Sequence, residues 1–204
     1  MTDPRAAIEA VFRIELPRLV AGLARLTRDV GRAEELAQDA IVVALERWPT
    51  DGVPDNPGAW LMTTARRRAI DGARHQRVAD AKHEQLAHAP EPASAADALI
   101  ERLDDDVGDD LLRLVFTACH PVLPFPARVA LTLRLVGGLT TAELARAFVV
   151  AEPTIAQRLV RAKHALAAAA VPFEVPRGAE RTERLAAVLE VIYLIFNEGH
   201  VATA

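Results

Sequence analysis

Two stretches of the sequence hold basic residues at a density that suits binding to phosphate groups. Residues 66–82 contain six basic side chains against two aspartates. The six are Arg66, Arg67, Arg68, Arg74, Arg77 and Lys82. Residues 153–170 contain Arg158, Arg161 and Lys163 and no acidic residue. Clusters of this kind bind nucleic acid by displacing its counterions. The alternatives left open are a solvated helix face for the first stretch and a packing helix for the second.

No other combination of residues indicates catalysis or metal binding. The sequence has no glycine-rich phosphate loop and no nucleophile elbow. Its cysteine and histidines, among them His83, Cys119 and His120, lack the spacing of zinc ligands. Acidic pairs such as Asp105 and Asp106 have no convergent partner group. We therefore expect a protein that is not an enzyme and that uses no cofactor and no metal ion.

The composition is that of a folded chain with an aliphatic core. Of 204 residues, 51% are apolar and 4% aromatic, which excludes a wholly disordered chain and suits one or two domains. The net charge of −4 offers no global attraction to nucleic acid, so a basic site must be local. The single cysteine cannot form an internal disulfide, and no apolar run approaches the roughly 20 residues of a membrane span. We expect a cytoplasmic location and no membrane contact.

Hydrophobic periodicity predicts an all-α chain, because three- and four-residue steps recur and no segment alternates as a strand does. Three helices are expected in the first half, over residues 8–26, 32–48 and 57–78. Pro49 is expected to end the second helix. The polar residues of that second helix are expected to face outward; they are Glu34, Glu35, Gln38, Asp39 and Glu46. The acidic run from Asp97 to Asp110 is expected to be solvated.

The second half contains the strongest local pattern of the sequence. Helices are expected over residues 109–119, 125–136, 140–148, 153–170 and 181–196. Thr140 and Glu143 fit a capping box that opens the short third helix of this set. Pro153 suits the first turn of the fourth. A short helix, a tight turn and a longer helix predict a helix-turn-helix unit, whose second helix enters the DNA major groove.

Spacing indicates which residues of the expected recognition helix would meet DNA. Gln157, Val160 and Arg161 share a face with His164. They can contact adenine, a thymine methyl group and guanine, respectively. The residues that flank this face and are expected to hold phosphates are Thr154, Arg158 and Lys163. The opposite, buried face is expected to comprise Ile155, Leu159, Ala162 and Leu166.

Two separate motifs, in a fixed order, resemble the extracytoplasmic-function (ECF) sigma factors of bacterial RNA polymerase. Residues 32–41 (RAEELAQDAI) and 59–71 (AWLMTTARRRAID) are similar to the first DNA-binding region of that family. Residues 139–163 are similar to its helix-turn-helix. The resemblance implies two helical domains and a linker. These are a sigma region 2 helical bundle over 1–79, a flexible acidic linker over 80–107, and a sigma region 4 helix-turn-helix domain over 108–171. Residues 172–204 resemble the start of a helical C-terminal extension found in one branch of the family.

The resemblance also implies partners and roles. The chain would bind core RNA polymerase and direct promoter-specific transcription initiation. Glu35, Gln38 and Asp39 would dock on the clamp helices of the largest polymerase subunit, and the second region would bind the flap. The residues implied for the −10 element, where a base is flipped from the non-template strand, are Asn56, Arg66, Arg67, Arg68, Arg74 and Arg77. Those implied for the −35 element are Thr154, Gln157, Arg158, Val160, Arg161 and Lys163.

Control of such a protein would come from an anti-sigma factor or from its own C-terminal extension. A further hypothesis, from charge alone, is that the acidic linker competes with DNA for the basic helices. One alternative function is a stand-alone helix-turn-helix regulator that binds a palindromic operator as a dimer. Another is an interaction module whose last helix recruits a partner while the basic helices stay idle.

Overall fold

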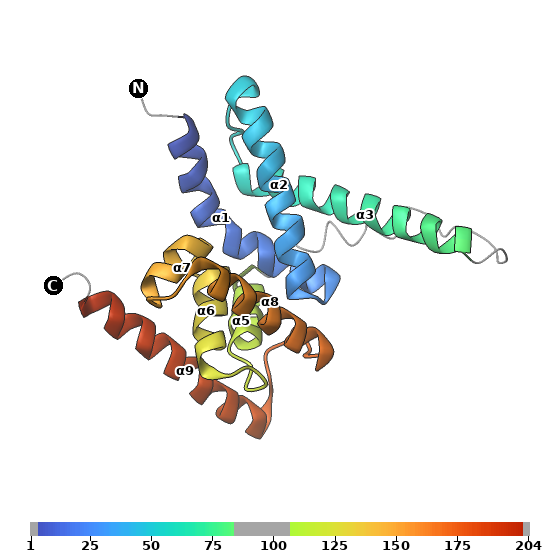
Figure 1. Ribbon diagram of the computed structural model, residues 1–204. Coiled ribbons are helices and arrows are strands. Elements are labelled where there is room, and N and C mark those ends of the chain that lie inside the picture. Colours follow the sequence, from blue (N-terminus) through green and yellow to red (C-terminus); the bar gives the residue numbers. More distant parts are fainter. Residues whose placement is uncertain (1–3, 84–106, 202–204) are drawn as a thin grey trace.

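The computed structural model describes residues 4–83 and 107–201, and this part of the chain is helical without any strand (Figure 1). The all-α prediction is therefore confirmed. The N-terminal region contains α1 (Pro4–Thr27), α2 (Val30–Asp51) and α3 (Pro57–His83). The C-terminal region contains α5 (Val107–Ala118), α6 (Phe125–Leu135), α7 (Thr141–Ala147), α8 (Glu152–Ala168) and α9 (Gly178–Val201). Most of the expected acidic linker, including Asp105 and Asp106, lies outside the described residues.

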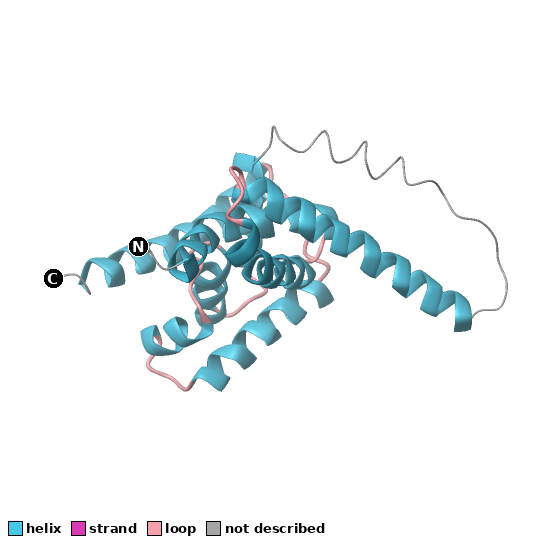
Figure 2. Ribbon diagram, turned by 90° about the horizontal axis from the view of Figure 1, so that it is seen from above, coloured by secondary structure: helices cyan, strands magenta, loops and turns pink. Residues whose placement is uncertain are grey.

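The N-terminal region is a three-helix bundle in which every pair of helices packs together. Leu23 of α1, Leu36 of α2 and Leu61 of α3 are at most 1% exposed and form its centre. Such apolar burial contributes about 1.5–3 kcal/mol for each large side chain. Figures 1 and 2 show α3 leaving one side of this bundle. The bundle thus supports α2 and α3, the two helices whose residues were expected to meet polymerase and DNA.

The second helix of the bundle does not end at Pro49, as the sequence had indicated, but two residues later at Asp51. A proline removes the hydrogen bond that its nitrogen would donate to the carbonyl four residues back and crowds that carbonyl. The residues after Pro49 keep their N–H groups, so helical hydrogen bonding resumes after it. The end is set instead by Gly52, which has φ 84° and donates its N–H to the Trp48 carbonyl at 3.0 Å. A positive φ is open to glycine without steric penalty.

The helix-turn-helix prediction is confirmed in its local detail. The Thr140 hydroxyl accepts the Glu143 N–H at 3.2 Å, and the Glu143 carboxylate accepts the Thr140 N–H at 2.8 Å. This capping box opens α7, and α8 begins at Glu152 with a proline in its first turn. Between them Val149 has φ 52° and is 89% exposed, which is unusual for a β-branched residue.

The last helix packs on the chain itself through one face. Val188 and Val191 of α9 are buried against Phe116 of α5 and Val129 of α6. Arg184, 4% exposed, donates to the Phe116 carbonyl at 3.1 Å and to Glu180. The opposite face of α9 remains apolar and exposed; it carries Leu185, Leu189, Ile192 and Tyr193. The helix is therefore firmly attached to the C-terminal region.

The two regions are packed against each other. Helix α1 contacts α5 and α6, and α2 contacts α8. One continuous apolar cluster includes Leu23 of the N-terminal region and Leu114 and Leu131 of the C-terminal region. Asp110, at the end of the acidic run, is 3% exposed and pairs with Arg25 of α1 and Arg113 of α5. The expectation of a solvated acidic run is therefore wrong for Asp110, because two cations compensate its burial.

Candidate nucleic-acid interface

Helix α8 presents the polar face that its spacing predicted. Gln157, Val160 and Arg161 are all exposed, Val160 by 49%. The four residues of the expected buried face lie inside the core; they are Ile155, Leu159, Ala162 and Leu166. The buried face packs on α6 and α7, so α8 is held with the residues expected to read bases directed to solvent. An amide, a guanidinium and a methyl group then stand on one helical face, the combination that suits direct readout in the major groove.

The three residues expected to hold phosphates have different surroundings. Thr154 is exposed in the first turn of α8. The Arg158 guanidinium lies over the Phe148 ring, 5.2 Å from its centroid, a cation–π contact that orients the side chain. Lys163 does not point to solvent, because its Nζ is 2.9 Å from Glu34 Oε2 of α2. In this arrangement Thr154 and Arg158 are open to a phosphate, and Lys163 is already engaged.

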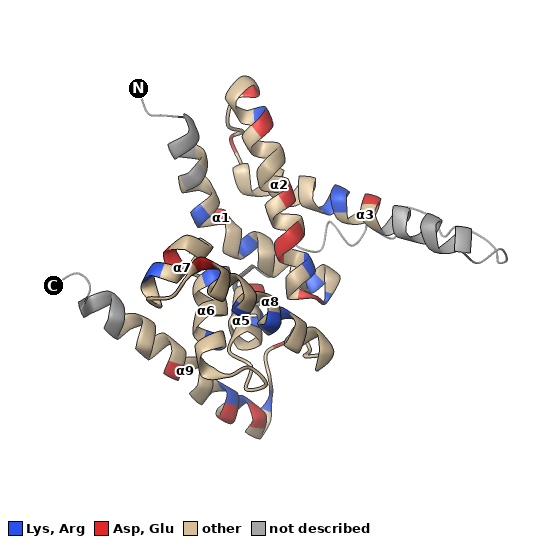
Figure 3. Cartoon of the chain, in the orientation of Figure 1, with Lys and Arg blue, Asp and Glu red and all other residues tan. Residues whose placement is uncertain are grey.

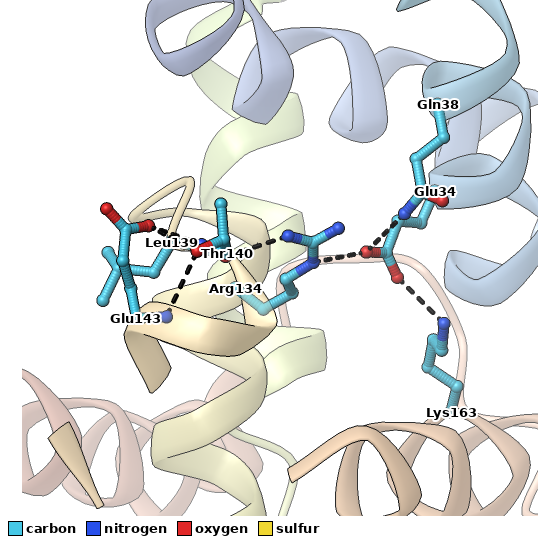
Figure 4. Close-up of polar contacts among 7 residues, drawn as sticks. All are labelled: Glu34, Gln38, Arg134, Leu139, Thr140, Glu143 and Lys163. Atoms are coloured by element: carbon cyan, nitrogen blue, oxygen red, sulfur yellow. Dashed lines mark hydrogen bonds and ion pairs between the residues drawn. The ribbon is translucent and has the colours of Figure 1, made fainter. Parts of the chain in front are cut away.

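The Glu34 carboxylate is the centre of a polar cluster between the two regions (Figure 4). Its Oε1 accepts from Arg134 Nε at 2.7 Å and its Oε2 from Lys163 Nζ at 2.9 Å. Gln38 Nε2 also donates to Oε1, at 3.1 Å. Burial alone would raise the pKa of Glu34, but the charges and hydrogen bonds of Lys163 and Arg134 outweigh it and lower that pKa. The carboxylate is therefore held in its ionised form.

The expectation that Glu34 faces outward is wrong, since it is 3% exposed. Its neighbours Ala33 and Ala37 are buried, and a core-facing helix buries positions beside its main apolar line. The sequence did indicate that Glu34 could be buried, because it lies beside the apolar positions of α2 that face the core. What the sequence did not show is the pair of cations that meets it, because Arg134 and Lys163 lie 100 and 129 residues away.

The expected polymerase-binding residues lie together on the exposed side of α2. Glu35 forms an ion pair with Arg32 at 3.1 Å, and Gln38 donates to Glu34. Asp39 pairs with Arg68 of α3 at 3.4 Å. All three predicted side chains are exposed, and exposed ion pairs of this type contribute at most about 1 kcal/mol. A partner protein can therefore rearrange the Glu35 and Asp39 ion pairs at small energetic cost.

The expected −10 residues divide into several groups. Asn56 caps α3, because its Oδ1 accepts the Ala59 N–H at 3.0 Å, so it has a structural task. Arg67 and Arg68 are exposed on α3, and Arg66 is half-buried. Figure 3 shows this basic group on α3 next to the acidic residues of α2. The side chains of Arg74, Arg77 and Lys82 lie outside the described part of the chain.

Three further observations concern clusters of possible metal ligands, the single cysteine and helix length in the described residues. Among them no three histidine, cysteine or acidic side chains gather closely enough to hold a metal ion. Cys119 is buried with its Sγ 3.3 Å from Thr132 Oγ1, and burial raises the pKa of the thiol. The stretches 4–83 and 107–201 contain no helix with the length and apolarity that a membrane crossing demands.

These observations define a class: a two-region helical protein with a helix-turn-helix in its second region. Comparison with known families makes the class specific. Residues 11–78 match the family model for Sigma-70 region 2, and residues 113–166 match that for Sigma-70, region 4. Because the chain also shares 32% identity with an ECF RNA polymerase sigma factor over 74% of that relative, it belongs to the ECF family of RNA polymerase sigma factors.

Individual relatives agree with this membership. The chain is 32% identical over 148 residues to the ECF RNA polymerase sigma factor SigK of Mycobacterium ulcerans, covering 70% of this chain and 74% of the relative. It is 31% identical over 162 residues to SigK of Mycobacterium tuberculosis H37Rv, covering 76% of this chain and 81% of SigK. Uncharacterized protein R00370 of Rhizobium meliloti is 43% identical over 189 residues, 91% of this chain. The chain spans only 44% of the length of R00370.

Proposed function

We propose that this protein binds core RNA polymerase and directs it to promoters by recognising −10 and −35 DNA elements. The observation that carries the proposal is the recognition helix α8, which exposes Gln157, Val160 and Arg161 and buries the opposite face. Region 4 would use this face to read the −35 element, where a guanidinium, an amide and a methyl group distinguish bases. Thr154 and Arg158 would hold the flanking phosphates.

The N-terminal region would supply the other contacts. The exposed face of α2 with Glu35, Gln38 and Asp39 suits the clamp helices of the largest polymerase subunit. The exposed arginines of α3 suit the −10 strand, from which one base would be flipped, at a cost of a few kcal/mol that a basic channel offsets. The family relation supports both assignments. We propose the same domain limits as from the sequence: 1–79 for region 2, 80–107 for the linker and 108–171 for region 4.

The remaining assignments concern location and control. With polymerase and promoter DNA as partners, the protein would act in the bacterial cytoplasm. Region 4 would bind the polymerase flap. Residues 172–204 would start a C-terminal extension, which the exposed apolar face of α9 supports. Either that extension or an anti-sigma factor would control the activity.

Polymerase binding is the first test. Purified core polymerase is expected to retain the wild-type chain in a pull-down and to lose the Gln38→Lys, Asp39→Lys double variant. The two new positive charges would meet the partner surface that the wild-type residues match, and like-charge contacts cost several kcal/mol. The Thr182→Lys, Glu183→Lys double variant, at exposed positions of α9, raises the net charge by the same three units and is expected to bind as the wild type does. Loss of binding in this control as well would show that net charge alone, and not α2, governs the interaction.

The stand-alone regulator remains the alternative to be excluded. It requires a dimer, because two recognition helices must lie about one DNA turn apart. Light scattering of the wild-type chain in the presence of operator-length DNA decides between the two. A DNA-bound dimer that promotes no initiation with core polymerase would favour the regulator and refute the sigma-factor proposal.

A further inference from the structure

Arg134 and Lys163 converge on one anion from two different helices of the C-terminal region. Arg134 lies in α6 and Lys163 in α8, and each binds a different oxygen of the Glu34 carboxylate. Arg134 is also fixed by Nη1, which donates to the Leu139 carbonyl at 2.9 Å. The side chains of the two cations are only 17% and 22% exposed. This pair is therefore an oriented anion-binding site built entirely from the C-terminal region.

The anion that fills this site comes from the other region. Glu34 belongs to α2, and α2 contacts α8 directly. A carboxylate and a phosphate share the feature that matters here, two oxygens carrying delocalised negative charge. Arginine and lysine bind both groups with short, charge-assisted hydrogen bonds. Because Lys163 is on the recognition helix, its site is close to the surface that would face DNA.

We propose that Arg134 and Lys163 form a binding site for a backbone phosphate of DNA, and that Glu34 occupies this site as an internal competitor when the two regions are packed together. We call these three residues the Glu34 clasp. The proposal rests on the proposed function, since it assumes that α8 binds DNA. A phosphate enters only after α2 has moved away, because Glu34 is 3% exposed and fills the site.

The packing of the two regions makes this competition a property of the whole chain. Opening the clasp separates α2 from α8 and exposes both cations to solvent or DNA. DNA binding and interregional packing therefore exclude each other at this site, and each must weaken the other by the same factor. Gln38, whose amide also binds Glu34, places the clasp next to the α2 face proposed for polymerase.

The test measures binding of the 204-residue chain to a fluorescent duplex of about 30 base pairs with arbitrary sequence, because phosphate contacts are independent of sequence. Glu34→Gln keeps the shape of the side chain and removes its charge. We expect it to bind roughly tenfold more tightly than the wild type, within the usual range of coupling between two sites. Glu46→Gln is the matched control, since it makes the same change of charge at an exposed carboxylate on the same helix. The control is expected to show a much smaller change.

A double-variant comparison separates the clasp from a general change in charge. The gain from Glu34→Gln is expected to disappear when Arg134 and Lys163 are both changed to Gln. In the Glu34→Gln background, Lys163→Gln is expected to reduce the slope of log K against log[salt] by about 0.9, the value for one phosphate contact. Circular dichroism confirms that each variant is folded. Should Glu34→Gln fail to fold, Glu34→Asp keeps the charge but draws the carboxylate back, and a smaller gain is expected.

Three results would overturn the inference. The first is equal binding by Glu34→Gln and wild type. The second is a gain that persists without Arg134 and Lys163. The third is the absence of DNA binding in every variant. Transcription initiation with core polymerase is measured in parallel, so that failure of the clasp is distinguished from failure of the proposed function.

Discussion

The Glu34 clasp predicts an unequal effect of removing its two ends on the free energy of unfolding. Arg134→Ala removes two hydrogen bonds, one to Glu34 Oε1 at 2.7 Å and one to the Leu139 carbonyl at 2.9 Å. It leaves a carboxylate whose side chain is only 4% exposed with a single cation. Glu34→Gln instead leaves two cations that are 17% and 22% exposed. Those cations can regain water, whereas the buried carboxylate cannot.

The magnitudes follow from this difference. Breaking a buried ion pair by removing one partner costs about 3–5 kcal/mol when the remaining charge is uncompensated. Lys163 still compensates Glu34 in Arg134→Ala, so we expect the lower end, about 3 kcal/mol. Glu34→Gln retains an acceptor for Arg134, and a hydrogen bond to a charged group is worth about 1.5–3 kcal/mol. We therefore expect a smaller loss for Glu34→Gln, about 1–2 kcal/mol.

Urea unfolding followed by circular dichroism measures both losses. Glu35→Ala, which removes an exposed ion pair, is the reference and is expected to lie within about 0.5 kcal/mol of the wild type. The m-value must remain unchanged for the comparison to concern stability alone. If Arg134→Ala is no more destabilising than Glu35→Ala, the clasp does not stabilise the packed arrangement and the reasoning from burial is refuted.

Three further predictions concern readout, backbone strain and pH. Arg161→Ala is expected to cost about 1–3 kcal/mol at a cognate promoter and to relax specificity at one base, whereas Arg158→Ala weakens binding across sequences; equal losses at every −35 variant for Arg161→Ala would contradict this. Val149→Gly is expected to raise stability by roughly 0.5–1 kcal/mol. A left-handed conformation costs a non-glycine residue about 1–2 kcal/mol, and the greater conformational entropy that glycine loses on folding offsets part of the gain. An unchanged thermal midpoint would show that the turn is unstrained. Because the pKa values of Glu34 and Glu143 are lowered from 4.5, their stabilising effect is complete above pH 4.5 and is lost as the pH falls through the lower folded-state values. Acid unfolding of Glu34→Gln should accordingly depend less on pH than that of the wild type, and identical acid profiles would contradict the assignment.

The sequence alone was sufficient for features that depend on neighbouring residues. The capping box of Thr140 and Glu143, the proline at the start of α8 and the buried face from Ile155 to Leu166 all follow from spacings of a few residues. Local hydrogen bonds and helical periodicity decide these features, so they are readable before any fold is known. The same local information identified the family, because both of its motifs lie within short helical segments.

Two predictions from local sequence patterns were wrong, one on where a helix ends and one on the exposure of an acidic residue. Pro49 was expected to end a helix, but it occupies a last turn that Gly52 closes. Asp110 belongs to an acidic run expected to be solvated, yet Arg25 and Arg113 bind it in the interior. For Pro49 the deciding residue, Gly52, is a neighbour in the sequence. For Asp110 the tertiary structure supplied the Arg25 partner.

Only the tertiary structure determined that Glu34 meets Arg134 and Lys163. A helical period assigns Glu34 to a position beside the core, but it contains no information about a cation 100 or more residues away. The contact exists because the two regions pack together, which brings α2 against α8. The sequence predicts Lys163 to be a phosphate ligand because of its place on the expected recognition helix. In the packed structure it is the partner of a buried carboxylate. Electrostatic partners are chosen by distance in space, and that distance is a property of the fold.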